Sequence, residues 1–537
     1  ASHGTLEAFT EAVLTASYRK GLDLYTIDEL GETLTEAVER MAEQYPQNRV
    51  RLKAIGGGGG KGQRIGPLGK AAMTPELVLE ILNEVKATGV GDNKNVLVEL
   101  NIETTRHQEI QVIGNGDWCI TLGGRDCSLQ MHEQKLLEVS VTRESLVAAQ
   151  SRAKQAGAEQ EAAVLAQDLE TLDAMEDEAA RFGEAVGLDS VSTFECIVDR
   201  DQHFFMEMNT RLQVEHPVTE EITGVDLVEW QLRVASGEPI PLSQEDLFID
   251  GHAIEARLYA EDPAGGFLPS TGALDHFDLG VEGRIETGVE EGDRISPFYD
   301  PMVAKLVVWG EARGDAIDQL AGIAENVEIW PVKTNAAFIA NCLRDEDFEQ
   351  ANLDTGFIET KLDDLVSSDE ADDDIWQSAA DFIALAETED YEDLPIGLRL
   401  NAPGVLSATL THKGETRTVS AARAGTESFA TGFVDPARAV VFADGQSFVF
   451  ERQSRGSGAA AAGDGAILAP MPGKVIAVDV AEGDTVTAGQ RLMVLEAMKM
   501  EHALTAPFDG TVTELAASEG GQVQVEAVLA VVEPKEE

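Results

Sequence analysis

Charged and amide side chains alternate along residues 207–220, which read EMNTRLQVEHPVTE. On a β-strand, successive side chains point to opposite sides, so the odd-numbered positions would share one face. Those positions hold Glu207, Asn209, Arg211, Gln213 and Glu215. Such a row is either a solvated sheet face or the wall of a site that binds a metal and an anion. We favour the site, because Glu195 adds a third carboxylate and Mg²⁺ prefers oxygen ligands.

A glycine-rich loop is the second candidate for chemistry. Five glycines occupy positions 56–60, and Lys61 and Gly62 follow them. Glycine lets backbone N–H groups approach phosphates closely. The P-loop pattern GxxxxGK[ST] is not met, since position 55 is Ile and position 62 is Gly. A glycine run alone is more often a linker, but the preceding β-rich run with Lys53 favours a flap that covers a nucleotide.

Lys499 lies at the centre of an internal repeat in the last segment of the chain. Residues 473–475 read Gly-Lys-Val and residues 510–512 read Gly-Thr-Val, while the pairs 482–483 and 519–520 are both Glu-Gly. This duplication predicts two similar β-units joined by a hairpin at Lys499. An isolated turn lysine is usually unremarkable in function. Here Met498 and Met500 flank it, which is unusual on an exposed turn, and a modifying enzyme could reach it there.

The elements that must position these residues follow from their periodicity. Helical spacing covers residues 144–187, and short alternating pieces between about 395 and 452 predict a small β-rich unit. The run 363–374 is predicted to be a surface stretch, and GSGAAAAGDG (456–465) a flexible linker. Strands are predicted at 50–55, 95–102, 108–114, 119–124, 193–199, 203–209 and 302–310.

Composition restricts the classes of partner. The 537 residues include 97 Asp and Glu but only 40 Lys and Arg, which gives a formal charge of −57. A field of that sign repels phosphate backbones and anionic lipids, so we expect neither nucleic acid nor membrane as a partner. The four cysteines form no CxxC pair, and the first residues lack the pattern of a signal peptide. These features favour a cytoplasmic protein with reduced thiols.

The segment 467–533 resembles the biotinyl domain of biotin-dependent carboxylases. That resemblance rests on Ala-Met-Lys-Met at 497–500 and on Ala-Pro-Met-Pro-Gly at 469–473. It implies biotin attached covalently to Lys499. The related lipoyl domain usually carries Asp-Lys-Ala at the turn, so the two methionines favour biotin.

The glycine loop resembles the flap of the ATP-grasp fold, and three longer stretches resemble biotin carboxylase. They are EMNTRLQVEHPVTEEITG from Glu207, GHAIEARLYAEDP (251–263) and YDPMVAKLVVWGE (299–311). The order of segments is similar to alpha subunits of acyl-CoA carboxylases of the 3-methylcrotonyl or propionyl type. The implied fold is α+β and multidomain, with an ATP-grasp biotin carboxylase region, a small β-rich middle domain and a C-terminal biotinyl β-sandwich. The implied boundaries are 1–245 for the ATP-grasp part, 246–362 for the carboxylase C-terminal domain, 363–455 for a domain that docks a carboxyltransferase, 456–466 for the linker and 467–537 for the carrier.

The resemblance also implies roles for residues. Glu215 would be the base that deprotonates bicarbonate, Arg284 would stabilise the biotin enolate, and Lys135 would lie near the transferring phosphoryl group. Bicarbonate would contact Arg211, Gln213 and Val214, and Mg²⁺ or Mn²⁺ would bind Glu195 and Glu207 with Asn209 beside them. ATP would contact Lys53, Gly57, Gly58, Gly59, Glu99, Ile102, His107 and Gln130.

The implied reaction has two steps. Bicarbonate attacks the γ-phosphate of ATP, and the resulting carboxyphosphate supplies CO₂ to biotin. Because nothing in the sequence resembles a domain that binds acyl-CoA, the acyl-CoA would be bound by a separate carboxyltransferase beta subunit. A biotin protein ligase would modify Lys499. We therefore expect a hetero-oligomer.

Two departures from the family pattern keep alternatives open. The motifs with which the family opens are not found, so we expect the N-terminal subdomain to be missing or divergent. The family pattern Arg-Arg-His-Gln-Lys is replaced by Met-His-Glu-Gln-Lys at 131–135, which puts a negative charge near phosphates. A carrier and assembly subunit with a weak or inactive carboxylase site is therefore one alternative, and an ATP-grasp ligase fused to a lipoyl-like domain is another.

Overall fold

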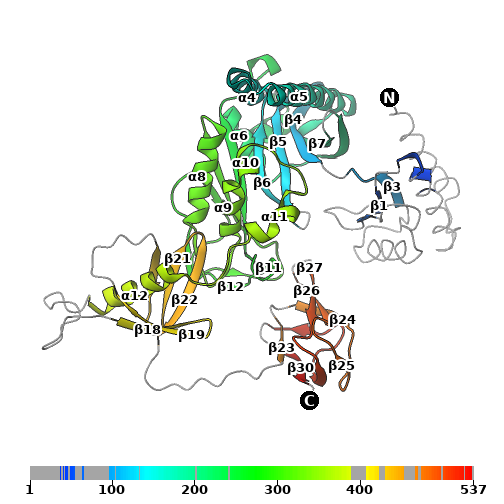
Figure 1. Ribbon diagram of the computed structural model, residues 1–537. Coiled ribbons are helices and arrows are strands. Elements are labelled where there is room, and N and C mark those ends of the chain that lie inside the picture. Colours follow the sequence, from blue (N-terminus) through cyan, green and yellow to red (C-terminus); the bar gives the residue numbers. More distant parts are fainter. Residues whose placement is uncertain are drawn as a thin grey trace.

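The computed structural model describes most of the chain from residue 96 onward and short pieces before it (Figure 1). The described residues are 37, 40–41, 43–45, 49–54, 63–65, 96–102, 105–131, 134–199, 202–239, 242–388, 407–421, 430–452, 466–469, 473–497, 500–524 and 527–534. None of the helices within these ranges is both long and apolar enough to cross a bilayer.

The most N-terminal described sheet has three antiparallel strands in the order β2-β1-β3. This confirms the strands predicted on either side of the glycine loop, while the loop itself lies outside the described residues. Their bounds are Val50–Ala54 for β1, Gln63–Ile65 for β2 and Val96–Leu100 for β3.

An eight-stranded antiparallel sheet forms the centre of the molecule, in the order β14-β16-β9-β6-β5-β4-β7-β8. It contains the strands predicted around 108, 119, 193, 203 and 302. The strands are β4 (Arg106–Asn115), β5 (Cys119–Met131), β6 (Gln134–Val141), β7 (Asp189–Asp199), β8 (Gln202–Asn209), β9 (His252–Tyr259), β14 (Arg284–Thr287) and β16 (Met302–Gly310).

One face of this sheet is apolar and is covered by helices. The helices α4 (Arg143–Ala156) and α5 (Glu159–Val186) confirm the helical spacing at 144–187. Helix α5 packs on β4 and β5, and α4 packs on α5. Leu172 and Met175 of α5 meet Ile110 and Val112 of β4 in a fully buried cluster. A capping box at Thr142 starts α4, and Gly157 ends it in the left-handed region that glycine adopts without strain.

A second group of helices covers the rest of the apolar face (Figure 1). Leu320 of α8 and Phe338 of α9 share a core with Ile254 of β9 and Leu306 of β16. These elements are α8 (Arg313–Glu325), α9 (Ala336–Arg344), α10 (Glu346–Glu349) and α11 (Phe357–Leu365). The short elements around them are η1 (Gln244–Asp246), β10 (Glu261–Asp262), β11 (Leu268–Pro269), β12 (Gly272–Ala273), β13 (His276–Asp278), β15 (Arg294–Ile295) and β17 (Glu328–Trp330).

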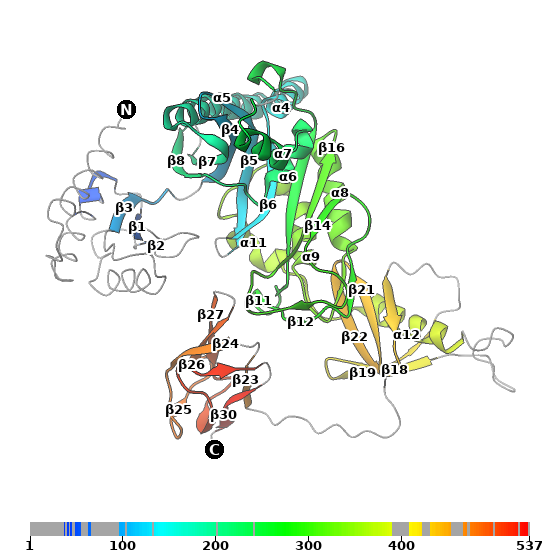
Figure 2. The ribbon, with the colours of Figure 1, turned by 180° about the vertical axis from the view of Figure 1, so that it is seen from behind.

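The opposite face of the sheet carries α6 (His216–Thr223) and α7 (Leu227–Ala235), as Figure 2 shows from behind. Helix α6 lies across β5, β6, β9 and β16. The prediction of one continuous strand from Glu207 to Glu215 is wrong. Strand β8 ends at Asn209, and Glu215 is the residue directly before α6, at its N-cap. Pro217 explains the change, because proline is favoured in the first turn of a helix and cannot donate to a sheet.

The middle unit combines one helix with a five-stranded antiparallel sheet in the order β19-β18-β22-β21-β20. The prediction that 363–374 is a surface stretch is confirmed, since only Leu365 is buried in it; α11 extends to Leu365 and α12 begins at Asp373. Trp376 of α12 packs on Phe450 of β22 with ring centroids 4.9 Å apart. The elements are α12 (Asp373–Thr388), β18 (Ser407–His412), β19 (Glu415–Ser420), β20 (Thr431–Val434), β21 (Arg438–Ala443) and β22 (Gln446–Arg452).

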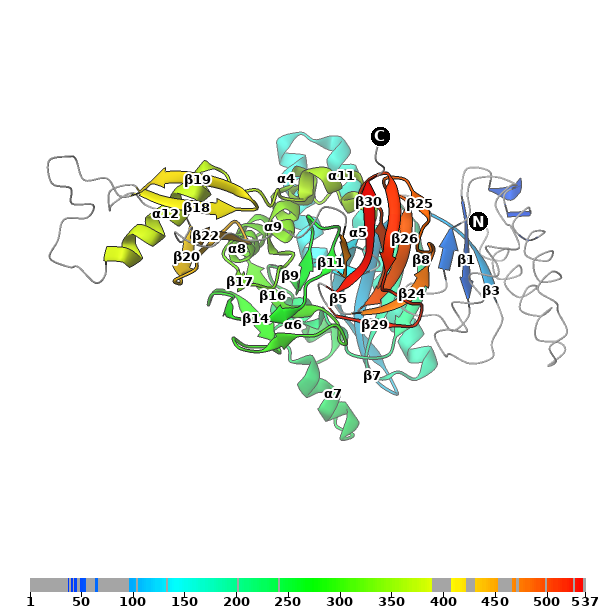
Figure 3. The ribbon, with the colours of Figure 1, turned by 90° about the horizontal axis from the view of Figure 1, so that it is seen from below.

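The C-terminal unit is a sandwich of two four-stranded sheets, ordered β23-β30-β28-β25 and β27-β26-β24-β29 (Figure 3). The two orders match strand for strand when the repeat is applied, which confirms the predicted pseudo-two-fold duplication. The strands are β23 (Ala466–Leu468), β24 (Gly473–Val478), β25 (Thr485–Val486), β26 (Arg491–Ala497), β27 (Met500–Thr505), β28 (Gly510–Leu515), β29 (Gln522–Val523) and β30 (Val528–Pro534). Ala497 pairs with Met500, and Met498 and Lys499 between them lie outside the described residues.

Candidate active site

Strand register brings charged side chains into rows on the face that α6 covers. One row crosses four neighbouring strands, where Arg125 of β5 pairs with Glu109 of β4, Glu109 with Glu195 of β7, and Glu195 with Glu207 of β8. A second row joins Glu286 of β14, Lys305 of β16 and Arg257 of β9. Paired residues on adjacent strands have Cβ atoms about 4.5–5.5 Å apart. The sheet therefore assembles acids and bases that are far apart in the sequence.

A β-bulge places Lys135 on this face. Leu129 pairs with Leu137 and Gln130 with Lys135, so Leu136 is an extra residue on β6. Leu136 and Leu137 both pack into the apolar core. Because the bulge shifts the alternation by one residue, Lys135 and Glu138 both face the charged rows.

Lys135 is the centre of the resulting network. Its Nζ lies 2.7 Å from Glu109, 2.5 Å from Glu215 and 3.6 Å from Glu195. Burial lowers the pKa of Lys135, but the surrounding acidic groups outweigh this and raise it well above its usual value. The amine therefore stays protonated, and it offers a fixed positive charge where an anion could bind.

Glu215 is almost fully buried at the start of α6 and is held from two sides. Its Oε1 accepts from Lys135 at 2.5 Å, and its Oε2 accepts from Arg257 at 3.0 Å. Lys305 donates to the carbonyl oxygen of Val214 at 3.0 Å, which fixes the loop before the helix. The carboxylate is thus presented in one orientation.

The loop between β8 and α6 connects Arg211 to the acidic row. Arg211 donates from Nη1 to Gln213 Oε1 at 2.5 Å, and Gln213 Nε2 donates to Glu195 Oε1 at 3.0 Å. Arg211 and Glu215 do not share a strand face as predicted, since neither lies on a strand. They are connected through Gln213, Glu195 and Lys135 instead.

The predicted metal ligands Glu195 and Glu207 face each other across β7 and β8. Asn209 donates to Glu195 at 2.6 Å and to Glu207 at 3.3 Å. Burial alone would raise the pKa of Glu195, but the hydrogen bond from His107 and the charge of Lys135 hold it below its usual value. Ionised carboxylate oxygens suit a hard cation such as Mg²⁺. His107, Glu109 and Glu195 also place one ligand atom each within 4.8 Å of one another.

The predicted ATP contacts divide between two sheets. On the eight-stranded sheet, His107 lies 2.9 Å from Glu195, and Gln130 Nε2 donates to His107 Nδ1 at 2.5 Å. Glu99 lies on β3 and Ile102 follows it, and among the described residues no hydrogen bond or ion pair joins them to this cluster. Lys53 lies on β1, while Gly57, Gly58 and Gly59 fall outside the described residues.

Arg284 lies at the edge of the network, on β14. It contacts Glu220 and Glu221 of α6 at 2.8 and 3.2 Å and Glu286 at 2.5 Å. Burial opposes the charge, but hydrogen bonds to the three acids raise the pKa of Arg284. The guanidinium is therefore held on the same face as Glu215.

Several members of the network were not predicted from the sequence. Most of them are charged residues inside largely apolar strands, as in QEIQVI, HAIEARLY and MVAKLVVW. An ionised side chain in such a run is costly to bury unless it is paired, so the pattern itself was a usable signal. The residues are Glu109, Arg125, Glu138, Glu255, Arg257 and Lys305.

We expect Arg125→Met to destabilise the fold by about 3–5 kcal/mol, because it leaves Glu109 without its closest buried partner. Arg125 and Glu109 are both fully buried and lie 2.5 Å apart. Burial would raise the pKa of Glu109, but Arg125 and Lys135 lower it to about 2 from 4.5. The ionised acid therefore stabilises the native state above pH 4.5, and this contribution is lost as the pH falls toward 2.

Denaturant unfolding at pH 7 and pH 3 measures this effect. The matched control is Arg233→Met, whose exposed partner Glu229 makes a pair worth about 1 kcal/mol or less. Equal losses for the two variants at pH 7 would contradict the prediction.

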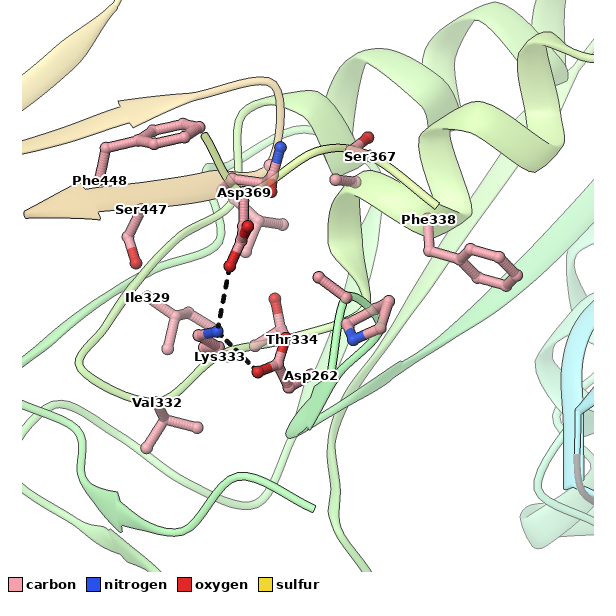
Figure 4. A pocket seen from close by; sticks show the side chains of 16 residues that line it. Asp262, Ile329, Val332, Lys333, Thr334, Phe338, Ser367, Asp369, Ser447 and Phe448 are labelled. Atoms are coloured by element: carbon pink, nitrogen blue, oxygen red, sulfur yellow. Dashed lines mark hydrogen bonds and ion pairs between the residues drawn. The ribbon is translucent and has the colours of Figure 1, made fainter. Parts of the chain in front are cut away.

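A surface pocket lies apart from the network (Figure 4). It is bounded by β10, the segment after β17 and the turn between β21 and β22. Lys333 in its wall lies 2.6 Å from Asp262 and 4.0 Å from Asp369. None of the predicted site residues lines this pocket.

Three family models match successive parts of the chain. The model of the carbamoyl-phosphate synthase L chain ATP binding domain matches residues 25–243. The biotin carboxylase C-terminal domain matches residues 255–360, and the model described as biotin-requiring enzyme matches residues 465–532.

Curated relatives match over most of the chain. The mitochondrial methylcrotonoyl-CoA carboxylase subunit alpha of Rattus norvegicus is 34% identical over 568 residues, which cover 95% of this chain and 75% of the relative. The propionyl-CoA carboxylase alpha chain of Ruegeria pomeroyi is 32% identical and covers 98% of this chain and 84% of the relative.

Two solved structures share the carboxylase region. The biotin carboxylase domain dimer of the 2-oxoglutarate carboxylase from Hydrogenobacter thermophilus, in complex with MgADP, ADP and bicarbonate, has a TM-score of 0.53 at 35% identity over 62% of this chain and 69% of its own. A complex of biotin carboxylase from Campylobacter jejuni with a β-γ-ATP ligand has a TM-score of 0.51 at 32% identity over 61% and 68%.

These matches define an ATP-grasp ligase that carries a biotin carrier domain on the same chain. The chain belongs to the alpha subunits of acyl-CoA carboxylases, as the sequence resemblance predicted. The alternative of a carrier subunit with an idle carboxylase site is not favoured by these matches.

Proposed function

We propose that the charged network on the eight-stranded sheet carboxylates biotin with bicarbonate and ATP, and that Glu215 is the base that deprotonates bicarbonate. The position of Glu215 supports this assignment most strongly. Its buried carboxylate is held by Lys135 and Arg257, and these two cations offset the repulsion between it and an incoming anion. We assign bicarbonate contacts to Arg211, Gln213 and Val214.

Phosphate charge is neutralised by the same network in this proposal. Lys135 lies beside the transferring phosphoryl group, and the predicted ATP contacts are Lys53, the glycine loop, Glu99, Ile102, His107 and Gln130. Glu195 and Glu207 hold Mg²⁺ or Mn²⁺ with Asn209 beside them, and the bound ion would neutralise charge on the phosphates. The hydrogen bond between His107 and Glu195 would orient the Glu195 carboxylate.

Biotin attached to Lys499 supplies the nitrogen that accepts the CO₂ unit. Arg284 would stabilise negative charge that develops on bound biotin, because its guanidinium is held in place by three acids. A biotin protein ligase would attach the group.

The alpha subunits of this family pair with a carboxyltransferase beta subunit. We propose that this partner binds a 3-methylcrotonyl-CoA or propionyl-CoA substrate and docks on the unit formed by residues 363–455. The relatives named for these two substrates support the assignment. The assembly would be a cytoplasmic hetero-oligomer.

Phosphate release by the purified, biotinylated chain tests the proposal. We expect phosphate release that requires both bicarbonate and biotin. Carboxyphosphate forms only from bicarbonate, and biotin consumes the CO₂ that it supplies. The control omits each component in turn. Absence of release from a folded, biotinylated chain would favour the idle carrier, the alternative suggested by the changed loop Met-His-Glu-Gln-Lys at 131–135. Release that needs neither component would show ATP hydrolysis without carboxylation and would contradict the proposal.

A further expectation concerns the predicted linker, whose residues lie outside the described ranges. Because biotin must visit one site on this chain and one on the partner, deletion of residues 456–465 should leave Lys499 biotinylated but lower carboxylation of acyl-CoA by the assembled subunits. An avidin blot and a coupled assay with the partner measure the two effects. Unchanged coupled turnover would show that the linker does not carry the movement.

A further inference from the structure

Two fully buried glutamates of the network lie side by side, and neither has a role in the proposed reaction. Glu138 of β6 pairs directly with Glu255 of β9. The register places their Cβ atoms about 4.5–5.5 Å apart on one face of the sheet. Two ionised carboxylates at this separation in a dry interior would repel each other strongly.

The two acids differ in their partners. Arg257 Nη2 lies 2.5 Å from Glu138 and 3.0 Å from Glu215. Among the described residues, no cation lies within 4.0 Å of Glu255, so Arg257 pairs with Glu138 and not with Glu255. Within the same described part of the chain, the carboxylate oxygens of neither acid accept a hydrogen bond of good geometry. An ionised carboxylate left in that position would cost several kcal/mol, and a proton removes the cost.

We propose that Glu138 and Glu255 share one proton, carried mainly by Glu255, and that the pair thereby presents a single negative charge that positions Arg257 against Glu215. Glu255 and Glu138 are positioning residues, since they act on the base through Arg257. The inference rests on the proposed role of Glu215.

The surroundings of the pair are consistent with one shared proton. Burial and the adjacent Glu138 raise the pKa of Glu255 well above its usual range, and burial raises the pKa of Glu138 to about 7. Lys305 is engaged by Glu286 at 2.5 Å and by Val214, so it is not a partner for Glu255. The titratable groups that face the pair are Lys135 of β6, Arg257 and Tyr259 of β9, Lys305 of β16 and Glu215 at the start of α6.

The chemistry predicts different effects for the two amide variants. Glu255→Gln mimics the protonated acid and should lower biotin carboxylation by about threefold or less, whereas Glu138→Gln removes the anion that holds Arg257 and should lower it at least tenfold. Because Glu255→Gln has no proton to lose, the alkaline fall in its pH–rate profile should move upward or vanish. Glu261→Gln is the matched control, a buried acid outside the network.

Infrared spectroscopy of the full chain at pH 8.5 detects the proton directly. Half-buried Glu176 and buried Glu261, whose pKa values burial raises to about 7, are ionised at that pH. We expect a carbonyl band from a protonated carboxylic acid in the unmodified protein and its loss in Glu255→Gln. Absence of the band in the unmodified protein refutes the inference even if no variant folds, and it leaves the proposed function of Glu215 untouched. Equal damage by both amide variants, each shown to be folded, refutes it as well.

Discussion

Replacing Glu215 with glutamine is expected to lower bicarbonate-dependent ATP cleavage about 100-fold or more, the usual scale for loss of a general base. Glutamine keeps the shape of the side chain, and its single carbonyl oxygen can still accept from either Lys135 or Arg257, so the fold should survive. It cannot take a proton from bicarbonate. The Michaelis constant for ATP should change little, because the predicted ATP contacts lie elsewhere.

The control for this prediction is Glu238→Gln, an exposed acid at the surface that pairs with Arg233. Thermal unfolding of both variants separates loss of chemistry from loss of structure. Near-normal turnover in a folded Glu215→Gln protein would remove Glu215 from its proposed role, and the base would then have to be sought elsewhere in the network.

Replacing Lys499 with arginine is expected to abolish biotin attachment and, with it, all carboxylation of the carrier. Arginine keeps the positive charge but offers no amine that a biotin ligase can acylate. The two repeats that frame position 499 should fold as before, since the pairing of β26 with β27 ends at Ala497 and Met500.

Lys474→Arg is the matched control, because Lys474 is an exposed lysine on β24 of the same domain. An avidin blot and intact mass measure biotin attachment in both variants. Full avidin signal in the Lys499→Arg protein would show that another lysine carries the group, whereas loss of signal in Lys474→Arg would point to a general defect in recognition of the domain.

The sequence predicted the carrier domain well because its signals are local. The repeat, the turn flanked by methionines and the alternating strands all lie within one stretch of the chain, and the matching strand orders of the two sheets follow from the duplication. The strands that hold Glu195 and Glu207 were likewise predicted from alternation alone.

The charged network was only partly predictable, because strand register creates it. Nothing local indicates that Arg125 will face Glu109, or that Glu138 will pair with Glu255 more than a hundred positions away. The spacing of apolar and polar residues also gives no sign of the bulge at Leu136, which turns Lys135 toward Glu215. The prediction of a strand that continues through Glu215 was wrong because Pro217 lies in the first turn of a helix.

Transfer of radiolabelled bicarbonate to the biotinylated chain tests the central claim most directly. In the presence of ATP and Mg²⁺, we expect label on the C-terminal domain that avidin blocks and that the Lys499→Arg variant lacks. The Glu215→Gln variant should acquire label far more slowly while remaining fully biotinylated. A folded, fully biotinylated wild-type chain that takes up no label under these conditions would contradict the assignment of carboxylase activity to this network.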